Sequence, residues 1–351
     1  MERSGTRRKM PLSGGCLTFR TPPPPSGPWA TWLSSLSTKL GRTSTCLPLR
    51  RSRIKLSSTT TVLSSLHLTG PVIGVLVQSP RLQSADRRLF IAASYIKFLE
   101  AAGAKVVPVL LERSLGEYKE LFNSINGLLL PGGSTNIYTT NYSRALRILF
   151  KLALEANRKG DYFPVWGTCL GFQALSFMVS SEIRLTRTNS KGMALPLNFT
   201  KEAKGSRMFS GFPDELIQEL ASKPLALHSH KWSVTSRVFY TDHTLSTFYR
   251  AITTNWDEKQ EYVSTLEGYR YPFYGTQWHP EKLAFEWNQS SIPHSALGIR
   301  IMFYLAEFFV NEARKNFHSF SSEAKERKAL IWNYYAVSSG VRGVYVQKYY
   351  I

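Results

Sequence analysis

Residues 162–175 read YFPVWGTCLGFQAL, and this stretch decides the fold of the chain. A short apolar run ends at Gly167, Cys169 follows, and the residues after Gly171 are typical of a helix. A strand, a sharp turn and a helix in this order form a nucleophile elbow, in which the turn residue projects from the edge of a sheet. The glycines permit the bend, and the helix N-terminus stabilises a thiolate at Cys169. The alternative is a buried structural cysteine, which is common in protein cores.

The composition favours a globular protein, and its cysteine spacing is not that of a zinc site. Of the 351 residues 43% are hydrophobic, which is enough for a sizeable core. The three cysteines, Cys16, Cys46 and Cys169, are too few for a disulfide framework. No C-x-x-C or H-E-x-x-H motif is present, so we expect no zinc.

Half of the net charge of +20 lies at the N-terminus. Residues 1–70 hold 11 Lys or Arg and a single acid, Glu2. The remaining basic excess forms no long cluster, so we expect no nucleic-acid partner and instead the retention of a small polyanionic substrate. No apolar run reaches the roughly 18 residues that span a membrane.

Residues 1–69 are expected to form a disordered leader. They are rich in Ser, Arg and Pro, as in Pro22 to Pro25, and poor in acids, which is typical of an organelle transit peptide. They contain no convincing secretory signal. The alternative is a misassigned first exon that says nothing about location. Residues 70–351 are expected to form one catalytic domain.

Strands and helices alternate from residue 71 onward. This order predicts a doubly wound, mixed and mostly parallel α/β sheet flanked by helices, of the flavodoxin-like type, with its site at the carboxyl ends of the strands. The predicted strands are 71–78, 105–111, 127–130 and 162–166, and the predicted helices are 89–102, 118–125 and 142–156. Pro108 indicates an edge strand or a β-bulge.

The second half is richer in strands. We predict strands at 193–199, 225–232, 251–255, 262–267 and 274–278, and helices at 212–221 and 295–317. The tail from Ala336 is expected to add one further strand.

A second motif, YGTQWHPEK at residues 274–282, supplies a base for the thiol. His279 and Glu281 are two residues apart, and on an extended chain such side chains point the same way. Pro280 favours that extended conformation. A carboxylate beside a histidine fixes its tautomer and stabilises the imidazolium, so Cys169, His279 and Glu281 form a nucleophile, base and orienting group.

A third motif, Pro-Gly-Gly at residues 131–133, follows the third strand. Two glycines at a strand end leave backbone N–H groups open to a substrate oxygen. With the N–H of Leu170, that of Gly133 is expected to form an oxyanion hole, and Gly132 is expected to contact the substrate. The alternative is an ordinary tight turn.

The order PGG, GTCLG and WHPE resembles the class I glutamine amidotransferase-like proteins, and within them the γ-glutamyl hydrolase family, peptidase family C26. Further resemblance lies in IAASY at 91–95, SING at 124–127, PLNFT at 196–200, HKW at 230–232, EGY at 267–269 and FYLAEFFVNEARKN at 303–316. It extends from about residue 71 to at least residue 330.

The resemblance implies a thiol hydrolase that cleaves the γ-glutamyl bonds of folate and antifolate poly-γ-glutamates through a γ-glutamyl thioester, without a metal or cofactor. It implies Cys169 as nucleophile, His279 as general base and acid, Glu281 as its orienting group, and His230 in the substrate site. It also implies a homodimer in the lysosome or the extracellular space. Lys231 and Arg207 are candidates for a basic rim that attracts the α-carboxylates of the substrate.

Two features depart from the family pattern. Gln173, which we expect to contact the substrate, stands where animal members are acidic and glutamine amidotransferases carry Gln. This leaves the choice between endo- and exo-cleavage and the substrate affinity open. No secretory signal is found, although the sequons at Asn141, Asn198 and Asn288 suit a glycosylated protein. The alternatives are a glutaminase module that supplies ammonia to a synthetase, and an inactive binding protein.

Overall fold

The computed structural model describes residues 70–80, 87–182, 184–340 and 343–351. The expected leader at residues 1–69 lies outside these described residues, as do Cys16 and Cys46. The description below concerns the unit that follows.

The centre of the fold is an eight-stranded sheet with the strand order β3-β1-β4-β5-β11-β10-β9-β7. The first five strands run parallel and the last three antiparallel. The strands, in sheet order, are β3 (Lys105–Val109), β1 (Val72–Leu76), β4 (Gly127–Leu130), β5 (Val165–Thr168), β11 (Phe273–Thr276), β10 (Glu261–Gly268), β9 (Tyr249–Trp256) and β7 (Asn198–Phe199). This arrangement confirms the predicted mixed, mostly parallel sheet, with Pro108 on its edge strand.

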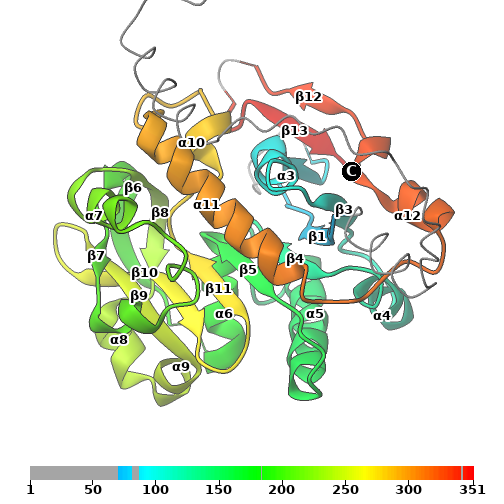
Figure 1. The fold of residues 1–351 in the computed structure, drawn as a ribbon, viewed down its shortest axis with the longest axis horizontal. Coiled ribbons are helices and arrows are strands. Elements are labelled where there is room, and N and C mark those ends of the chain that lie inside the picture. The colour runs from blue at the N-terminus through cyan, green and yellow to red at the C-terminus, as the bar shows by residue number, and fades with distance from the viewer. Residues whose placement is uncertain (1–69, 81–86, 183, 341–342) are drawn as a thin grey trace, which may run out of the picture. The chain divides into compact units, whose positions relative to one another are not determined.

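Helices cover both faces of the parallel part. The chain moves from β1 outward to β3 and then back past β1 to β4 and β5, and right-handed crossovers place the connecting helices of the two directions on opposite faces. One group packs α3 against α11, and the other packs α5 against α4 and α6 (Figure 1). These helices are α3 (Ala93–Glu100), α4 (Leu115–Phe122), α5 (Asn141–Arg158), α6 (Leu170–Ser180) and α11 (Ala296–Ala313).

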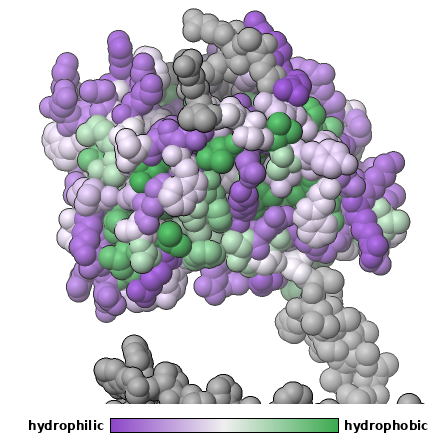
Figure 2. All heavy atoms as spheres, turned by 90° about the horizontal axis from the view of Figure 1, so that it is seen from above, coloured by the Kyte–Doolittle hydropathy of each residue, from purple (hydrophilic) through white to green (hydrophobic). Residues whose placement is uncertain are grey.

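The remaining elements surround the sheet. The shorter helices are α7 (Asp214–Ser222), α8 (Ser236–Thr241), α9 (His243–Phe248), α10 (Lys282–Phe285), α12 (Glu323–Ala329), η1 (Lys201–Gly205) and η2 (Ile331–Asn333). Strands β6 (Thr186–Leu195) and β8 (Ala226–Ser233) form a two-stranded sheet, and β12 (Ala336–Ser338), β13 (Gln347–Tyr350) and β2 (Phe90–Ala92) form a three-stranded one. On the face seen in Figure 2, hydrophobic residues lie between hydrophilic ones, and strongly hydrophilic side chains project mainly at the periphery.

The predicted helix at residues 89–102 was wrong in its first turn, which is strand β2. The Gln78 side chain accepts a hydrogen bond from the Ala92 N–H at 2.8 Å, and β13 pairs with β2 in antiparallel register. These long-range partners outweigh the helical periodicity of the segment. The helix predicted at 118–125 starts earlier, because Ser114 and Glu117 form a capping box.

The predicted strand at 193–199 is also split. Its first part belongs to β6, which starts at Thr186, and its end is the separate strand β7. The tail forms two strands rather than one. Strand β13 lies between β12 and β2, so the C-terminal segment pairs with β2 in a three-stranded sheet separate from the central one.

Candidate active site

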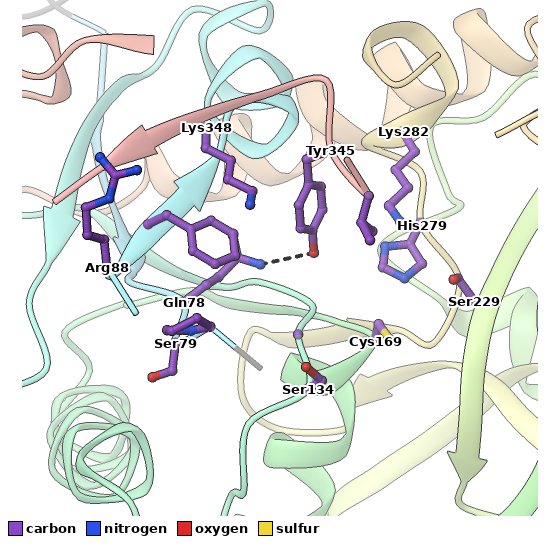
Figure 3. Close-up of a pocket in the computed structure, with 14 residues that line it drawn as sticks. Gln78, Ser79, Arg88, Ser134, Cys169, Ser229, His279, Lys282, Tyr345 and Lys348 are labelled. Atoms are coloured by element: carbon purple, nitrogen blue, oxygen red, sulfur yellow. Dashed lines mark hydrogen bonds between the residues drawn. The ribbon is translucent and has the colours of Figure 1, made fainter. Parts of the chain in front are cut away.

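The candidate site lies at the ends of four neighbouring parallel strands. The strands β1, β4, β5 and β11 end on the same edge of the sheet, so the residues that follow them meet there. Gln78 follows β1, Gly132 follows β4, Cys169 follows β5 and His279 follows β11. All four surround or support one cavity of about 190 Å³ (Figure 3).

Cys169 lies at the predicted elbow between β5 and α6. Its backbone φ is 51° and ψ is −99°, a left-handed conformation that costs a non-glycine residue about 1–3 kcal/mol. The Cys169 N–H donates to the Thr276 carbonyl at 2.8 Å, which fixes the turn against β11. The strain is maintained by this packing, as at many nucleophile elbows. The cysteine is unpaired, and 6% of its surface is exposed.

Two glycines allow the elbow to close. A Cβ atom on Gly171 would lie 2.0 Å from the Leu130 carbonyl oxygen, and one on Gly167 would lie 2.6 Å from the Gly171 carbonyl. Neither neighbour is a flexible side chain, so only glycine fits at these positions.

His279 and Glu281 form a buried pair beside the thiol. His279 Nδ1 lies 2.7 Å from Glu281 Oε1, and the His279 N–H donates to the Leu227 carbonyl at 2.8 Å. The sequence argument for this contact was wrong, because the chain is not extended here. Glu281 has φ −63° and ψ −20°, and it starts the turn that leads into α10. The two side chains therefore meet across a turn.

The surroundings of His279 favour its protonated form. Burial and the nearby Lys282 ammonium lower the pKa of His279, but the Glu281 carboxylate and the hydrogen-bonded Cys169 side chain outweigh them, so the pKa is raised. An imidazolium next to Cys169 stabilises negative charge on the sulfur.

Gly132 packs between the two reactive side chains. A Cβ atom there would lie 2.9 Å from His279 Cε1 and 3.3 Å from Cys169 Cβ. Its N–H donates to the Tyr95 hydroxyl at 2.8 Å, and its carbonyl accepts from Gln78 Nε2 at 2.5 Å. Both polar backbone groups of Gly132 are thus engaged within the protein, which supports a packing role rather than direct contact with substrate.

Gly133 lies next to the side chain of Leu170. A Cβ on Gly133 would be 3.1 Å from Leu170 Cδ2, and Gly133 lines the cavity together with Cys169. Leu170 is the first residue of α6, where a backbone N–H has no acceptor within the helix.

His230 lies outside the residues that line the cavity. It is 5% exposed, and its Nδ1 is 2.9 Å from Ser233 Oγ while its Nε2 is 3.1 Å from His228 Nδ1. Burial, with the nearby charge of His279, lowers the pKa of His230 to about 3. Its neighbour in the chain, Ser229, does line the cavity, so β8 borders the site.

Gln173 is also absent from the cavity wall. Its Nε2 donates to the Trp232 carbonyl at 2.7 Å and is 3.3 Å from Gln277 Oε1. The residue connects α6 to β8 and does not itself face the cavity.

The expected basic rim residues lie elsewhere. The Arg207 side chain binds Glu267 Oε1 at 3.0 Å and the carbonyls of Gly268 and Tyr271, and Lys231 is exposed outside the cavity. The cavity instead contains three other cations. Its described lining residues are Gln78, Ser79, Pro80, Arg88, Phe90, Gly133, Ser134, Cys169, Ser229, His279, Lys282, Val344, Tyr345 and Lys348.

Sequence reasoning missed the residues that the C-terminal segment brings to the site. Tyr345 precedes β13, and its hydroxyl accepts a hydrogen bond from Gln78 Nε2 at 3.3 Å (Figure 3). No local pattern marks Tyr345. Gln78 could have been recognised as a polar residue directly after a buried strand.

The sequons differ in accessibility. Asn141 and Asn198 are exposed, whereas Asn288 is partly buried. The Asn288 amide donates to the carbonyls of Gly340, Gly343 and Tyr345 at 3.3, 2.9 and 3.5 Å. It thereby holds the loop that carries Tyr345.

Within the described ranges, no group of three or more His, Cys, Asp or Glu residues is placed to hold a metal ion. Among the same residues, no helix is both long and apolar enough to cross a membrane.

The sheet topology and the elbow define an α/β protein with a cysteine at the carboxyl edge of its parallel strands. A family model described as peptidase C26 matches residues 71–281. Gamma-glutamyl hydrolase of Homo sapiens is 49% identical over 273 residues, which cover 77% of this chain and 86% of the human protein. That of Bos taurus is 48% identical over 282 residues, covering 80% and 89%.

Among solved structures, the glutaminase domain of CTPS from Trypanosoma brucei with bound acivicin is similar, with a TM-score of 0.48 and 14% identity. The match covers 71% of this chain and 96% of that one. The two curated relatives share the family of the matched model, and the chain belongs to it: the γ-glutamyl hydrolase family, peptidase family C26.

Proposed function

We propose that the protein is a thiol hydrolase that cleaves the γ-glutamyl bonds of folate and antifolate poly-γ-glutamates. The observation that carries the proposal is the strained elbow at Cys169 beside the buried His279–Glu281 pair, with Cys169 and His279 both lining one cavity. The relatives that carry the name gamma-glutamyl hydrolase support the choice of bond. Residues 70–351 form the catalytic unit in this proposal.

Cys169 acts as the nucleophile. Its thiolate forms a bond to the side-chain carbonyl carbon of the scissile glutamate, and the carbonyl electron pair moves to the oxygen. The N–H groups of Gly133 and Leu170 stabilise that oxyanion, an effect of about 3–4 kcal/mol per donor in acyl transfer. Gly133 lines the cavity next to Cys169 and lies against the Leu170 side chain, which supports this assignment.

His279 acts first as general acid and then as general base. Its proton passes to the nitrogen as the C–N bond breaks, and a γ-glutamyl thioester remains on Cys169. A water molecule then gives a proton to His279 and adds to the thioester carbon, and the C–S bond breaks. The Glu281 carboxylate orients the ring and stabilises the imidazolium in both halves. The raised pKa of His279 supports a protonated acid at the start.

The roles of His230 and Gln173 are indirect in this proposal. His230 supports β8, whose Ser229 borders the cavity, and Gln173 anchors α6 to β8. We also propose that the protein acts in the lysosome or the extracellular space as a homodimer. The exposed Asn141 and Asn198 support a secretory route.

The test compares two substrates. Purified protein is incubated with a folate poly-γ-glutamate and, separately, with glutamine, and the products are separated by chromatography. The proposal predicts release of glutamate or γ-glutamyl peptides from the folate substrate, and none from the Cys169→Ala variant. Release of ammonia from glutamine with no cleavage of the folate substrate would indicate a glutaminase instead.

A further inference from the structure

Lys282 has an unusual position for a lysine. It is the first residue of α10, only 2% of its surface is exposed, and it lines the cavity together with Cys169 and His279. In Figure 3 the side chain lies on the same side of the cavity as His279. Lysine is among the residues least often buried, so its burial here calls for a physical reason.

The ammonium group has no anionic partner among the described residues. No hydrogen bond or ion pair of its Nζ is found in that part of the chain, and its closest recorded contact is the Tyr345 ring, whose centroid lies 5.4 Å away. Glu281 is engaged by His279, and Glu286 accepts from the Val346 N–H at 2.6 Å; burial raises the pKa of Glu286, although the Lys282 charge opposes this. Neither carboxylate forms an ion pair with Lys282.

An ammonium that is buried without an ion-pair partner is costly, because it has lost its hydration and gained no opposite charge. A ligand carboxylate that enters the cavity would offset this cost. The lining supports an anionic ligand, because its described residues include the cations Arg88, Lys282 and Lys348 and neither Asp nor Glu. The Tyr345 ring confines the lysine side chain, and a confined donor loses little entropy on binding.

We propose that Lys282 binds the α-carboxylate of the glutamate that leaves with the scissile nitrogen. The assignment rests on the proposed function. In a γ-linked chain that α-carboxylate is separated from the scissile nitrogen by a single carbon atom. His279 must reach the same nitrogen to protonate it, and Lys282 follows His279 on the same turn. A carboxylate on Lys282 therefore places the nitrogen within reach of His279.

Arg88 and Lys348 lie on the opposite side of Tyr345 in the close-up (Figure 3). The further α-carboxylates of a longer chain would lie toward that side of the cavity, whereas Lys282 binds the one next to the bond that breaks. Lys282 thus selects glutamate, rather than a neutral amine, as the leaving group.

The experiment uses two substrates that differ in one group. The first is folate γ-diglutamate, and the second is its analogue in which the α-carboxylate of the leaving glutamate is a carboxamide. Wild-type protein is expected to cleave the first with a kcat/KM at least about 10-fold higher, because a charge-assisted contact is lost in the second. Equal kcat/KM values would overturn the proposal without any variant. Failure to cleave either substrate would count against the proposed function itself.

Variants of Lys282 test whether this residue causes the preference for the carboxylate substrate. Lys282→Met is expected to lower kcat/KM about 100-fold for the carboxylate substrate and to cause little further loss for the carboxamide, since the contact is already absent there. Lys282→Arg is expected to restore part of the preference. Lys151→Met removes an equal charge from an exposed position on α5 and should change neither value. An equal loss on both substrates would show a structural role and contradict carboxylate binding.

Discussion

Glu281 Oε1 lies 2.7 Å from His279 Nδ1, and both side chains are nearly excluded from solvent, with 1% and 3% exposure of the residues. A carboxylate in this position accepts the Nδ1 proton and leaves Nε2 as the reactive nitrogen. Because a carboxylate can only accept hydrogen bonds, the proton between the two side chains belongs to His279 Nδ1. The pair is thus the source of the proton that the proposed reaction moves.

Glu281→Gln is expected to lower kcat/KM by about 10³-fold, because an amide does not stabilise the imidazolium or enforce the tautomer. It should also shift the pH profile. Glu281 raises the pKa of His279 against the opposing effect of burial, so without it His279 loses its proton at lower pH. The alkaline limb of the kcat/KM profile should then move to lower pH.

Two control variants test whether the shift of the alkaline limb comes from the charges next to His279. The Lys282 ammonium lowers the pKa of His279, so Lys282→Met should move the alkaline limb to higher pH. Glu312→Gln changes a buried carboxylate that binds the Tyr274 hydroxyl at 2.6 Å, outside the cavity lining, and should not move the limb. A shift to higher pH in Glu281→Gln would contradict the assigned role of the pair.

Gly171→Ala is expected to destabilise the fold by about 3 kcal/mol or more, since its Cβ would overlap the Leu130 carbonyl of the neighbouring strand. Gly211→Ala is the matched control, because no atom lies within 4 Å of its added Cβ. Denaturant unfolding measures both variants. Equal midpoints for the two would show that the elbow is packed less tightly than described.

The buried pair of His228 and His230 should make the protein less stable in acid. Burial, with neighbouring histidine charges, lowers the pKa of both, so they stay neutral in the folded state while the unfolded chain binds protons below about pH 6.5. Each therefore removes up to about 1.4 kcal/mol of stability per pH unit as pH falls below that value. His228→Gln should reduce the slope of unfolding free energy against pH.

His243→Gln, at an exposed position on α9, is the control and should leave that slope as in the wild type. A slope in His228→Gln equal to that of the wild type would mean that the buried histidine takes up a proton within the fold.

Glycopeptide mapping of protein secreted from animal cells is expected to find glycans at Asn141 and Asn198 and none at Asn288. The Asn288 amide donates to carbonyls of the loop that ends at Tyr345, and a glycan on its nitrogen would break those contacts. Full occupancy at Asn288 would show that the loop does not adopt this conformation in the mature protein.

The parts of the site that depend on local sequence were predictable. The elbow at Cys169 follows from glycine spacing around a strand end, and the parallel sheet follows from alternating strands and helices. Glu281 was assigned correctly as a neighbour of His279 but for the wrong reason, because the short spacing fits a turn as well as an extended chain.

The parts of the structure that depend on long-range pairing could not be predicted from the sequence. Strand β2 looks helical until β13, far along the chain, pairs with it. Tyr345 reaches the cavity through the C-terminal segment that carries β13, and Lys282 reaches it through α10. No local periodicity marks either residue. Gln173 was expected at the substrate, but its amide is used by the Trp232 carbonyl.

The central claim is that Cys169 carries a γ-glutamyl thioester during turnover. Acid quenching of protein that is cleaving a folate poly-γ-glutamate, followed by peptide mass spectrometry, tests it most directly. The account predicts a γ-glutamyl adduct on the peptide that contains Cys169, absent before substrate is added and absent from Cys169→Ala. Undiminished cleavage by Cys169→Ala, or an adduct on any other residue, would contradict it.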